Sequence, residues 1–134
     1  MIEVVNRQRR LQIDTKGWTV FAAKALAAIG KSESSATIAF VSDNRIRELN
    51  RQFRGIDKAT DVLSFPADEP NNLGDVAVSV ETAVTQAQEN GLSFDEEVAQ
   101  LILHGLLHLS GYDHESDNGE MNRLELKLRK RLGI

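Results

Sequence analysis

The three histidines of the chain, His104, His108 and His114, lie within a segment of eleven residues. Four residues separate His104 from His108, so on a helix both imidazoles project from the same face, one turn apart. Helical zinc sites use this spacing to bind one metal ion through two nitrogens. Gly111 tolerates a positive φ, so a turn there would allow His114 to reach the same ion. The segment therefore predicts three nitrogen ligands and a fourth position left for water, as a catalytic metal requires.

The ligand chemistry favours zinc among the metals that bind imidazole. The sequence contains no cysteine, which excludes a thiolate site, an iron–sulfur cluster, a disulfide and a cysteine nucleophile. Three imidazoles without a thiolate suit zinc, although nickel, copper and iron also accept imidazole. The competing interpretation is that these histidines only pack on an apolar helix face. We favour the metal site because the chain has no histidine outside this segment.

One position separates the segment from the zinc proteases. The spacing matches their pattern His-Glu-x-x-His-x-x-Gly-x-x-His at every histidine and at the glycine, but Gly105 replaces the glutamate that activates water in those enzymes. Peptide hydrolysis is therefore not expected. Asp113 or Glu115 could act as the base from the other side. We favour the alternative that Asp113 only orients a histidine.

Three segments carry a wider likeness: residues 104–114, residues 49–66, which end in Asp61-Val62-Leu63-Ser64-Phe65-Pro66, and residues 73–83, which begin with Leu73-Gly74-Asp75. Together they resemble the YbeY family of bacterial metal-dependent endoribonucleases. The likeness spans nearly the whole chain, with the segments in the right order. The glycine in place of the protease glutamate makes the histidine segment specific to this family.

The resemblance implies a single zincin-like domain over residues 1–134 that binds one zinc ion through His104, His108 and His114. It implies that Arg54 is the catalytic basic residue facing the metal. The implied activity is zinc-dependent, single-strand-specific RNA cleavage in ribosomal RNA processing, including 3′-end maturation of the small-subunit 16S RNA, and in ribosome quality control. The implied partners are ribosomal RNA and the small ribosomal subunit or its assembly proteins. Neither DNA nor a membrane is expected.

The chemistry of Arg54 is compatible with that role. It ends a predicted helix that also carries Arg47 and Arg51, within the basic first part of the chain. A guanidinium binds two phosphate oxygens at once and keeps its charge at any physiological pH. The alternative is a structural ion pair between Arg54 and either Asp57 or Asp61.

Charge is distributed unevenly along the chain. The net charge is -4, but residues 59–122 contain thirteen acidic residues and no lysine or arginine, so the two ends are basic. The protein can therefore present a basic surface to RNA despite its net charge. The candidates for following an RNA backbone are Arg7, Arg9, Arg45, Arg47 and Arg51. Aromatic residues make up only 5% of the chain, so a large base-stacking platform is not expected.

The elements that must position these residues follow from apolar spacing. Strands are predicted at 2–6, 36–41, 62–65 and 74–80, with Pro66 ending the third. Helices are predicted from Asp14 or Thr15 to Gly30, from Asp43 or Asn44 to about Phe53, from about 81 to Asn90, from Phe94 to Leu109 and from about Asn118 to Leu132. Ser93 and Glu96 should form a capping box before the fourth helix. This order predicts an α+β fold with a mixed sheet of about four strands.

Size and composition limit the other possibilities. The chain has 134 residues, of which 41% are hydrophobic and 27% charged, as in one ordinary folded domain. No apolar run approaches the ~20 residues of a membrane span, and the first residues lack the apolar stretch of a signal peptide, so a cytoplasmic protein is expected. Two other functions remain open: a metalloprotease-like hydrolase, and a non-catalytic ribosome-assembly factor with a structural zinc. A fourth protein ligand would favour the structural zinc.

Overall fold

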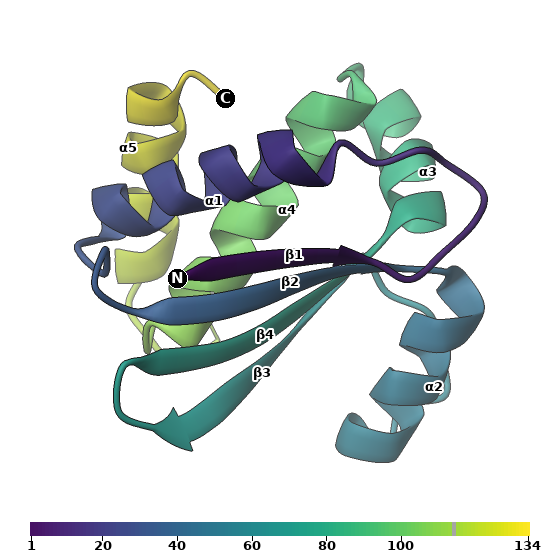
Figure 1. The fold of residues 1–134 in the computed structure, drawn as a ribbon, viewed down its shortest axis with the longest axis horizontal. Coiled ribbons are helices and arrows are strands. Elements are labelled where there is room, and N and C mark those ends of the chain that lie inside the picture. The colour runs from purple at the N-terminus through teal and green to yellow at the C-terminus, as the bar shows by residue number, and fades with distance from the viewer. Residues whose placement is uncertain (114) are drawn as a thin grey trace.

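The computed structural model describes residues 1–113 and 115–134, and in them it has four strands and five helices (Figure 1). The strands are β1 (Ile2–Asn6), β2 (Ser35–Val41), β3 (Val62–Glu69) and β4 (Asn72–Ser79). The helices are α1 (Thr15–Ile29), α2 (Asp43–Arg54), α3 (Val80–Asn90), α4 (Phe94–Leu109) and α5 (Glu120–Leu132). The predicted α+β class is confirmed. In the part of the chain that the structure describes, no helix is long and apolar enough to cross a membrane.

The four strands form one mixed sheet in the order β1-β2-β4-β3. β1, β2 and β4 run parallel to one another, whereas β3 runs antiparallel to β4. β3 is therefore an edge strand, and its residues alternate between the two faces of the sheet. The Ser64 hydroxyl donates a hydrogen bond to the Gly105 carbonyl of α4 at 3.1 Å, while Leu63 packs into a small apolar cluster beneath α2.

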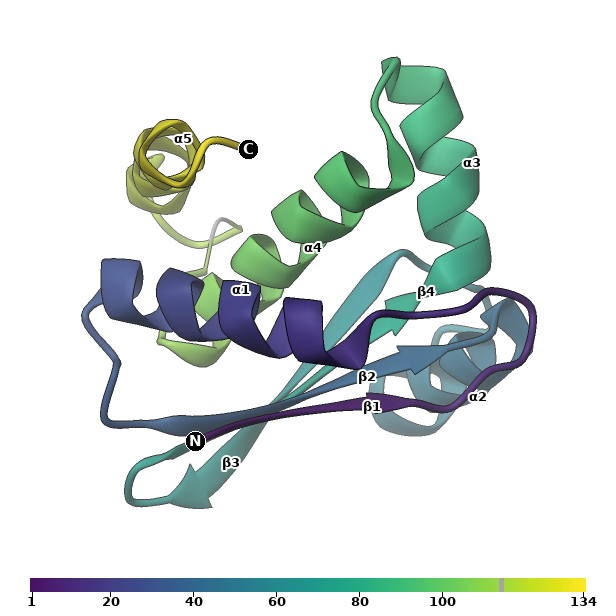
Figure 2. The same cartoon turned by 45° about the horizontal axis from the view of Figure 1, so that its top comes forward.

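Helices cover the two faces of the sheet unequally (Figures 1 and 2). α1, α3, α4 and α5 lie over one face, and α2 lies on the other. The main core fills the space between the first face and its helices, where Phe40, Leu103 and Leu106 are fully buried. On the second face, α2 buries Ile46 in a smaller cluster with Val41, Leu63 and Ala77. The positions of α2 and α4 on opposite faces determine how the site is assembled.

Two predicted boundaries were wrong. β3 does not end at Pro66 but continues to Glu69. Proline lacks a backbone N–H and is tolerated here because an edge strand need not donate on both sides. The second error concerns the start of α2, where the cap is Ser42 and neither Asp43 nor Asn44. The Asp43 carboxylate instead accepts a hydrogen bond from the Thr82 hydroxyl of α3 at 2.6 Å, so it joins two helix starts.

The helix that carries the described histidines begins with a reciprocal cap. The Ser93 hydroxyl accepts a hydrogen bond from the Glu96 backbone N–H at 3.1 Å, and the Glu96 carboxylate accepts one from the Ser93 N–H at 3.0 Å. The predicted capping box is confirmed. Hydrogen bonds from Ser93 to the Glu96 carboxylate lower the pKa of Glu96 below its usual value.

We expect Glu96→Ala to lower the melting temperature at neutral pH and to have a smaller effect in acid. A carboxyl group whose pKa falls on folding stabilises the folded state above its ordinary pKa of 4.5, and this stabilisation is lost as the pH falls through the folded value. Thermal denaturation of both proteins at about pH 7 and about pH 3 measures the change. Equal differences in melting temperature at the two pH values would show that the charge of Glu96 does not stabilise α4.

Candidate active site

α4 places His104 and His108 on one face, one turn apart. Their ring centroids are 4.8 Å apart and their planes meet at 74°. Both side chains line a cavity of about 450 Å³ beside β3. The four-residue spacing has thus brought two imidazoles to the wall of the same cavity, as helix periodicity requires.

Arg54 lines the same cavity from another element. It is the last residue of α2, and Gly55 follows in the left-handed conformation with φ of 70°, so the chain turns away directly after the arginine. Because α2 and α4 lie on opposite faces of the sheet, the cavity reaches around the edge strand between them, where Val62, Ser64 and Pro66 line it. The fold therefore joins a guanidinium and two imidazoles that are far apart in the sequence.

The acidic residues considered as partners of Arg54 are engaged elsewhere. Asp57 pairs with Arg47 at 2.8 Å, and the hydrogen bond and charge of Arg47 lower the pKa of Asp57. Asp61 accepts hydrogen bonds from the Thr60 hydroxyl and the Val62 N–H. Among residues 1–113 and 115–134, no salt bridge involves Arg54. Its charge can therefore act on an anion in the cavity.

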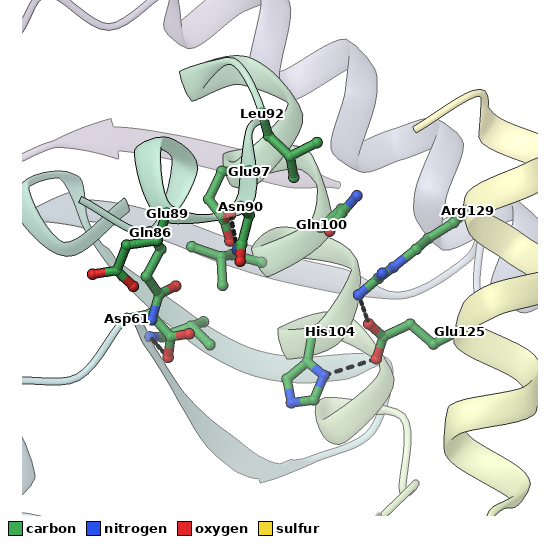
Figure 3. A pocket seen from close by; sticks show the side chains of 12 residues that line it. Asp61, Gln86, Glu89, Asn90, Leu92, Glu97, Gln100, His104, Glu125 and Arg129 are labelled. Carbon is green, nitrogen blue, oxygen red and sulfur yellow. Dashed lines mark hydrogen bonds and ion pairs between the residues drawn. The ribbon is translucent and has the colours of Figure 1, made fainter. Parts of the chain in front are cut away.

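A buried carboxylate from α5 holds His104 in place. Glu125 Oε1 lies 2.8 Å from His104 Nδ1, and Glu125 Oε2 accepts a hydrogen bond from Arg129 at 2.6 Å (Figure 3). Burial opposes ionisation of Glu125, but the hydrogen bonds and charges of His104 and Arg129 outweigh it, so the pKa of Glu125 is lowered. The contact fixes the orientation of the imidazole and assigns Nε2 as the nitrogen that can ligate a metal.

Glu125 was not predicted as a site residue, although the sequence carries a signal for it. Met121, Glu125 and Leu128 follow the spacing of one buried helix face, and all three are buried. An acidic residue in such a stripe requires a partner, because an unpaired buried carboxylate is costly. The sequence does not indicate that this partner is His104 on α4.

The other predicted site residues follow α4 in the sequence. His114 lies outside the described residues, and the described residues contain no group of three or more potential metal ligands. Asp113 accepts hydrogen bonds from the Glu115 N–H and the Ser116 hydroxyl, both at 3.0 Å, which stabilises the turn. Asp113 and Glu115 also line the cavity.

The basic residues proposed to follow an RNA backbone are dispersed. Arg47 is paired with Asp57, and Arg45 with Glu48 at 3.0 Å. Arg7 and Arg45 line a separate groove on the second face of the sheet. Arg9 and Arg51 line neither that groove nor the active-site cavity. Of these arginines and Arg54, only Arg54 lines the cavity that holds the two described histidines.

Comparisons with known proteins give the family. The family model described as "Endoribonuclease YbeY" matches residues 3–133. The "Endoribonuclease YbeY" of Koribacter versatilis is 43% identical over 131 residues, which cover 98% of this chain and 86% of that protein. The chain belongs to the YbeY family. The family member from Nautilia profundicola is 48% identical over 105 residues, which cover 77% of this chain and 76% of that protein.

A solved structure supports the fold. The solution structure of TM1509 from Thermotoga maritima matches with a TM-score of 0.70 and 31% sequence identity, covering 98% of this chain and 89% of that one. The fold prediction and the predicted family are both confirmed. As a member of the YbeY family the chain is a hydrolytic nuclease, which also confirms the prediction of an enzyme.

Gly105 of this YbeY-family chain allows α4 to approach the sheet closely. A Cβ atom at this position would lie 2.7 Å from Val76 Cγ1 and 3.3 Å from Ser64 Oγ. Any side chain would therefore force the side chain of Val76, or the helix itself, to shift. The structure gives a steric reason for glycine where the zinc proteases carry their catalytic glutamate.

We expect Gly105→Glu to destabilise the protein and to create no peptidase activity. Forcing a side chain into a packed contact costs ~1–3 kcal/mol, more than the helix propensity gained by replacing glycine. Gly105→Ala should show a smaller loss, since it adds only the Cβ atom. Chemical denaturation and cleavage of unstructured peptides measure the two effects. A stable Gly105→Glu variant that cleaves peptides would contradict this expectation.

Proposed function

We propose that this protein is a zinc-dependent endoribonuclease that cleaves single-stranded RNA. The observation that carries the proposal is the shared cavity, which Arg54 enters from α2 and His104 and His108 enter from α4. Imidazoles suit a metal ion, and a guanidinium suits the phosphate on which that ion would act. The names of the relatives from K. versatilis and N. profundicola support the same activity.

The donor set fits zinc. His104 and His108 would hold the ion together with His114, which the sequence supplies six residues after the second ligand. The hydrogen bond between His104 Nδ1 and the Glu125 carboxylate supports this assignment, because metal-ligating histidines usually donate from their second nitrogen to a carboxylate or carbonyl. When bound, zinc supplies Lewis-acid polarisation and lowers the pKa of water to about 7.

Side chains around the cavity would bind the phosphate, take up a proton and orient His104. Arg54 would bind two phosphate oxygens and stabilise the negative charge that grows during cleavage. Asp113 already accepts two hydrogen bonds within the turn, so Glu115 is the better placed of the two carboxylates to take up a proton. Glu125 would keep His104 oriented throughout.

We further propose that the substrate is ribosomal RNA in the cytoplasm. The reaction would include maturation of the 16S RNA 3′ end and cleavage in ribosome quality control, with the small subunit or its assembly proteins as partners. Family membership is the support for this assignment. The few aromatic residues agree with a protein that leaves much of its selectivity to such partners.

Two alternatives are less well supported. A metalloprotease with the usual pattern would carry its glutamate at position 105, where a side chain would collide with Val76. A structural zinc would need a fourth protein ligand, yet the two described histidines line a cavity of about 450 Å³.

The test combines metal analysis with cleavage assays on the purified protein. We expect about one zinc per chain, loss of RNA cleavage after chelation and recovery when zinc is restored, whereas an unstructured peptide stays intact throughout. Cleavage that persists in metal-free protein would disprove zinc dependence. Stoichiometric zinc without any RNA cleavage would favour the assembly factor, and peptide cleavage would favour the protease.

A further inference from the structure

A second groove meets the active-site cavity at β3. It has a volume of about 810 Å³ and lies between α2 and the second face of the sheet. Pro66 lines both the groove and the cavity. A polymer that enters the cavity can therefore continue over the edge strand into the groove.

Two of the five phenylalanines of the chain form a pair in this groove. Phe53 of α2 and Phe65 of β3 have ring centroids 5.2 Å apart and planes at 65°. Phe65 is half-buried against the small cluster beneath α2, whereas Phe53 is 66% exposed. Phe65 thus supports one side of the Phe53 ring, and much of that ring remains in contact with solvent. The fold gains little from so exposed a ring, which leaves its face available to a ligand.

The position of the two phenylalanines indicates that this ligand is a base of a nucleic acid. Phe53 directly precedes Arg54, and Phe65 directly precedes Pro66, which lines both spaces. Adjacent side chains on a helix or strand point in different directions, so the link between the two spaces is Pro66, past which a nucleoside attached to a phosphate on Arg54 would reach the aromatic pair. Any base has a π face that stacks on an aromatic ring.

The charges around the aromatic pair do not favour a phosphate placed on the rings. Arg7 and Arg45 line the groove together with Glu69 and Asp75, so the groove carries mixed charge. Asp75 is the cross-strand neighbour of Phe65 and would repel a phosphate placed on that ring. Arg54 has no salt bridge with a described residue and lines the cavity together with Asp61, Asp113 and Glu115, so it is the cation there that a phosphate would contact.

We propose that Phe53 and Phe65 stack one base of the RNA, on the nucleotide adjoining the phosphate held by Arg54. This inference rests on the proposed function, since it places an RNA strand in the cavity. It requires one stacked base only, which agrees with the low aromatic content of the chain. The pair is a binding element and takes no part in bond cleavage.

The first experiment measures cleavage of a single-stranded RNA by the zinc-loaded protein. Phe53→Leu keeps an apolar side chain but removes the π face, so we expect KM to rise about tenfold with a much smaller change in kcat. Phe53→Trp should retain the wild-type KM. Val20→Ala, at an apolar position of α1 that is 57% exposed, is the control and should match the wild type. Zinc content and melting temperature should be the same in all four proteins.

The second experiment does not depend on cleavage. A short RNA carries 2-aminopurine at one position at a time, and its fluorescence on protein binding reports stacking. We expect a change at one position that Phe53→Leu removes and Phe53→Trp keeps. If Phe53→Leu and the wild type had the same KM, or if the fluorescence change were the same in both, the stacking proposal would be overturned while RNA cleavage stands. If the fluorescence showed stacking at one position but the protein cleaved no RNA, the groove would be supported as a base-binding site and the proposed function would be refuted.

Discussion

Arg54→Glu is expected to lower the rate of RNA cleavage at least a hundredfold and to leave zinc content and melting temperature unchanged. The substitution places a carboxylate where the phosphate must approach, and loss of one preorganised charge contact at a reacting centre costs about 10²–10³ in rate. Arg54 forms no salt bridge with a described residue, so its replacement breaks no structural pair. Single-turnover cleavage, zinc analysis and thermal denaturation of the same preparation provide the measurements.

Two further variants make this expectation specific. Arg54→Lys keeps the charge but binds phosphate through one point, so its rate should fall between those of wild type and Arg54→Glu. Arg51→Glu makes the same charge reversal one turn earlier on α2, at a side chain that does not line the cavity. If Arg51→Glu were as inactive as Arg54→Glu, the effect would come from overall charge. Full activity of Arg54→Glu would remove Arg54 from the site.

The second large effect concerns the metal. His104→Ala or His108→Ala should abolish stoichiometric zinc binding, because two remaining nitrogens cannot hold a dilute divalent ion. Each ring lines the cavity wall, so the truncations should leave the helix folded. Zinc analysis after dialysis, with circular dichroism of the same samples, provides the test. Equal zinc content in the wild type and both variants would disprove the three-histidine site.

Glu125→Gln provides a graded comparison for the two histidine variants. Glutamine keeps the shape of the side chain but loses the charge that faces His104 and Arg129. Loss of such a supporting carboxylate typically weakens metal binding 10–100-fold without removing the site. A competition titration against a chelator would detect this intermediate affinity. Unchanged affinity would mean that Glu125 serves only to join α5 to α4.

The histidine pair was predictable because it depends on one local regularity. Once residues 94–109 form a helix, the spacing of His104 and His108 fixes their common face. The capping box at Ser93 was predictable for the same reason, since both partners lie within one turn. These two features depend on neighbours in the sequence and were predicted well, whereas the cap of α2, also a local feature, was assigned one or two residues too late.

Features that depend on the order of strands were not predictable in this way. The cavity forms because β3 occupies the sheet edge between α2 and α4, and no spacing within 62–69 reveals that position. The same fact explains the error at Pro66, which would end a central strand but not an edge strand. Glu125 was not predicted as a site residue because its partner, His104, lies on another helix.

The alternation of β3 has a consequence for changes in chain length. Ser64 contacts α4 on one face, and Leu63 and Phe65 lie on the face beneath α2. Inserting or deleting one residue within 62–66 would exchange the two sets of side chains between the faces. The hydroxyl would then enter the apolar cluster, and an aromatic ring would meet Gly105. Length variation should therefore be confined to the hairpin turn at Pro70 and Asn71. An added residue there lengthens a loop and leaves the register of the strand unchanged.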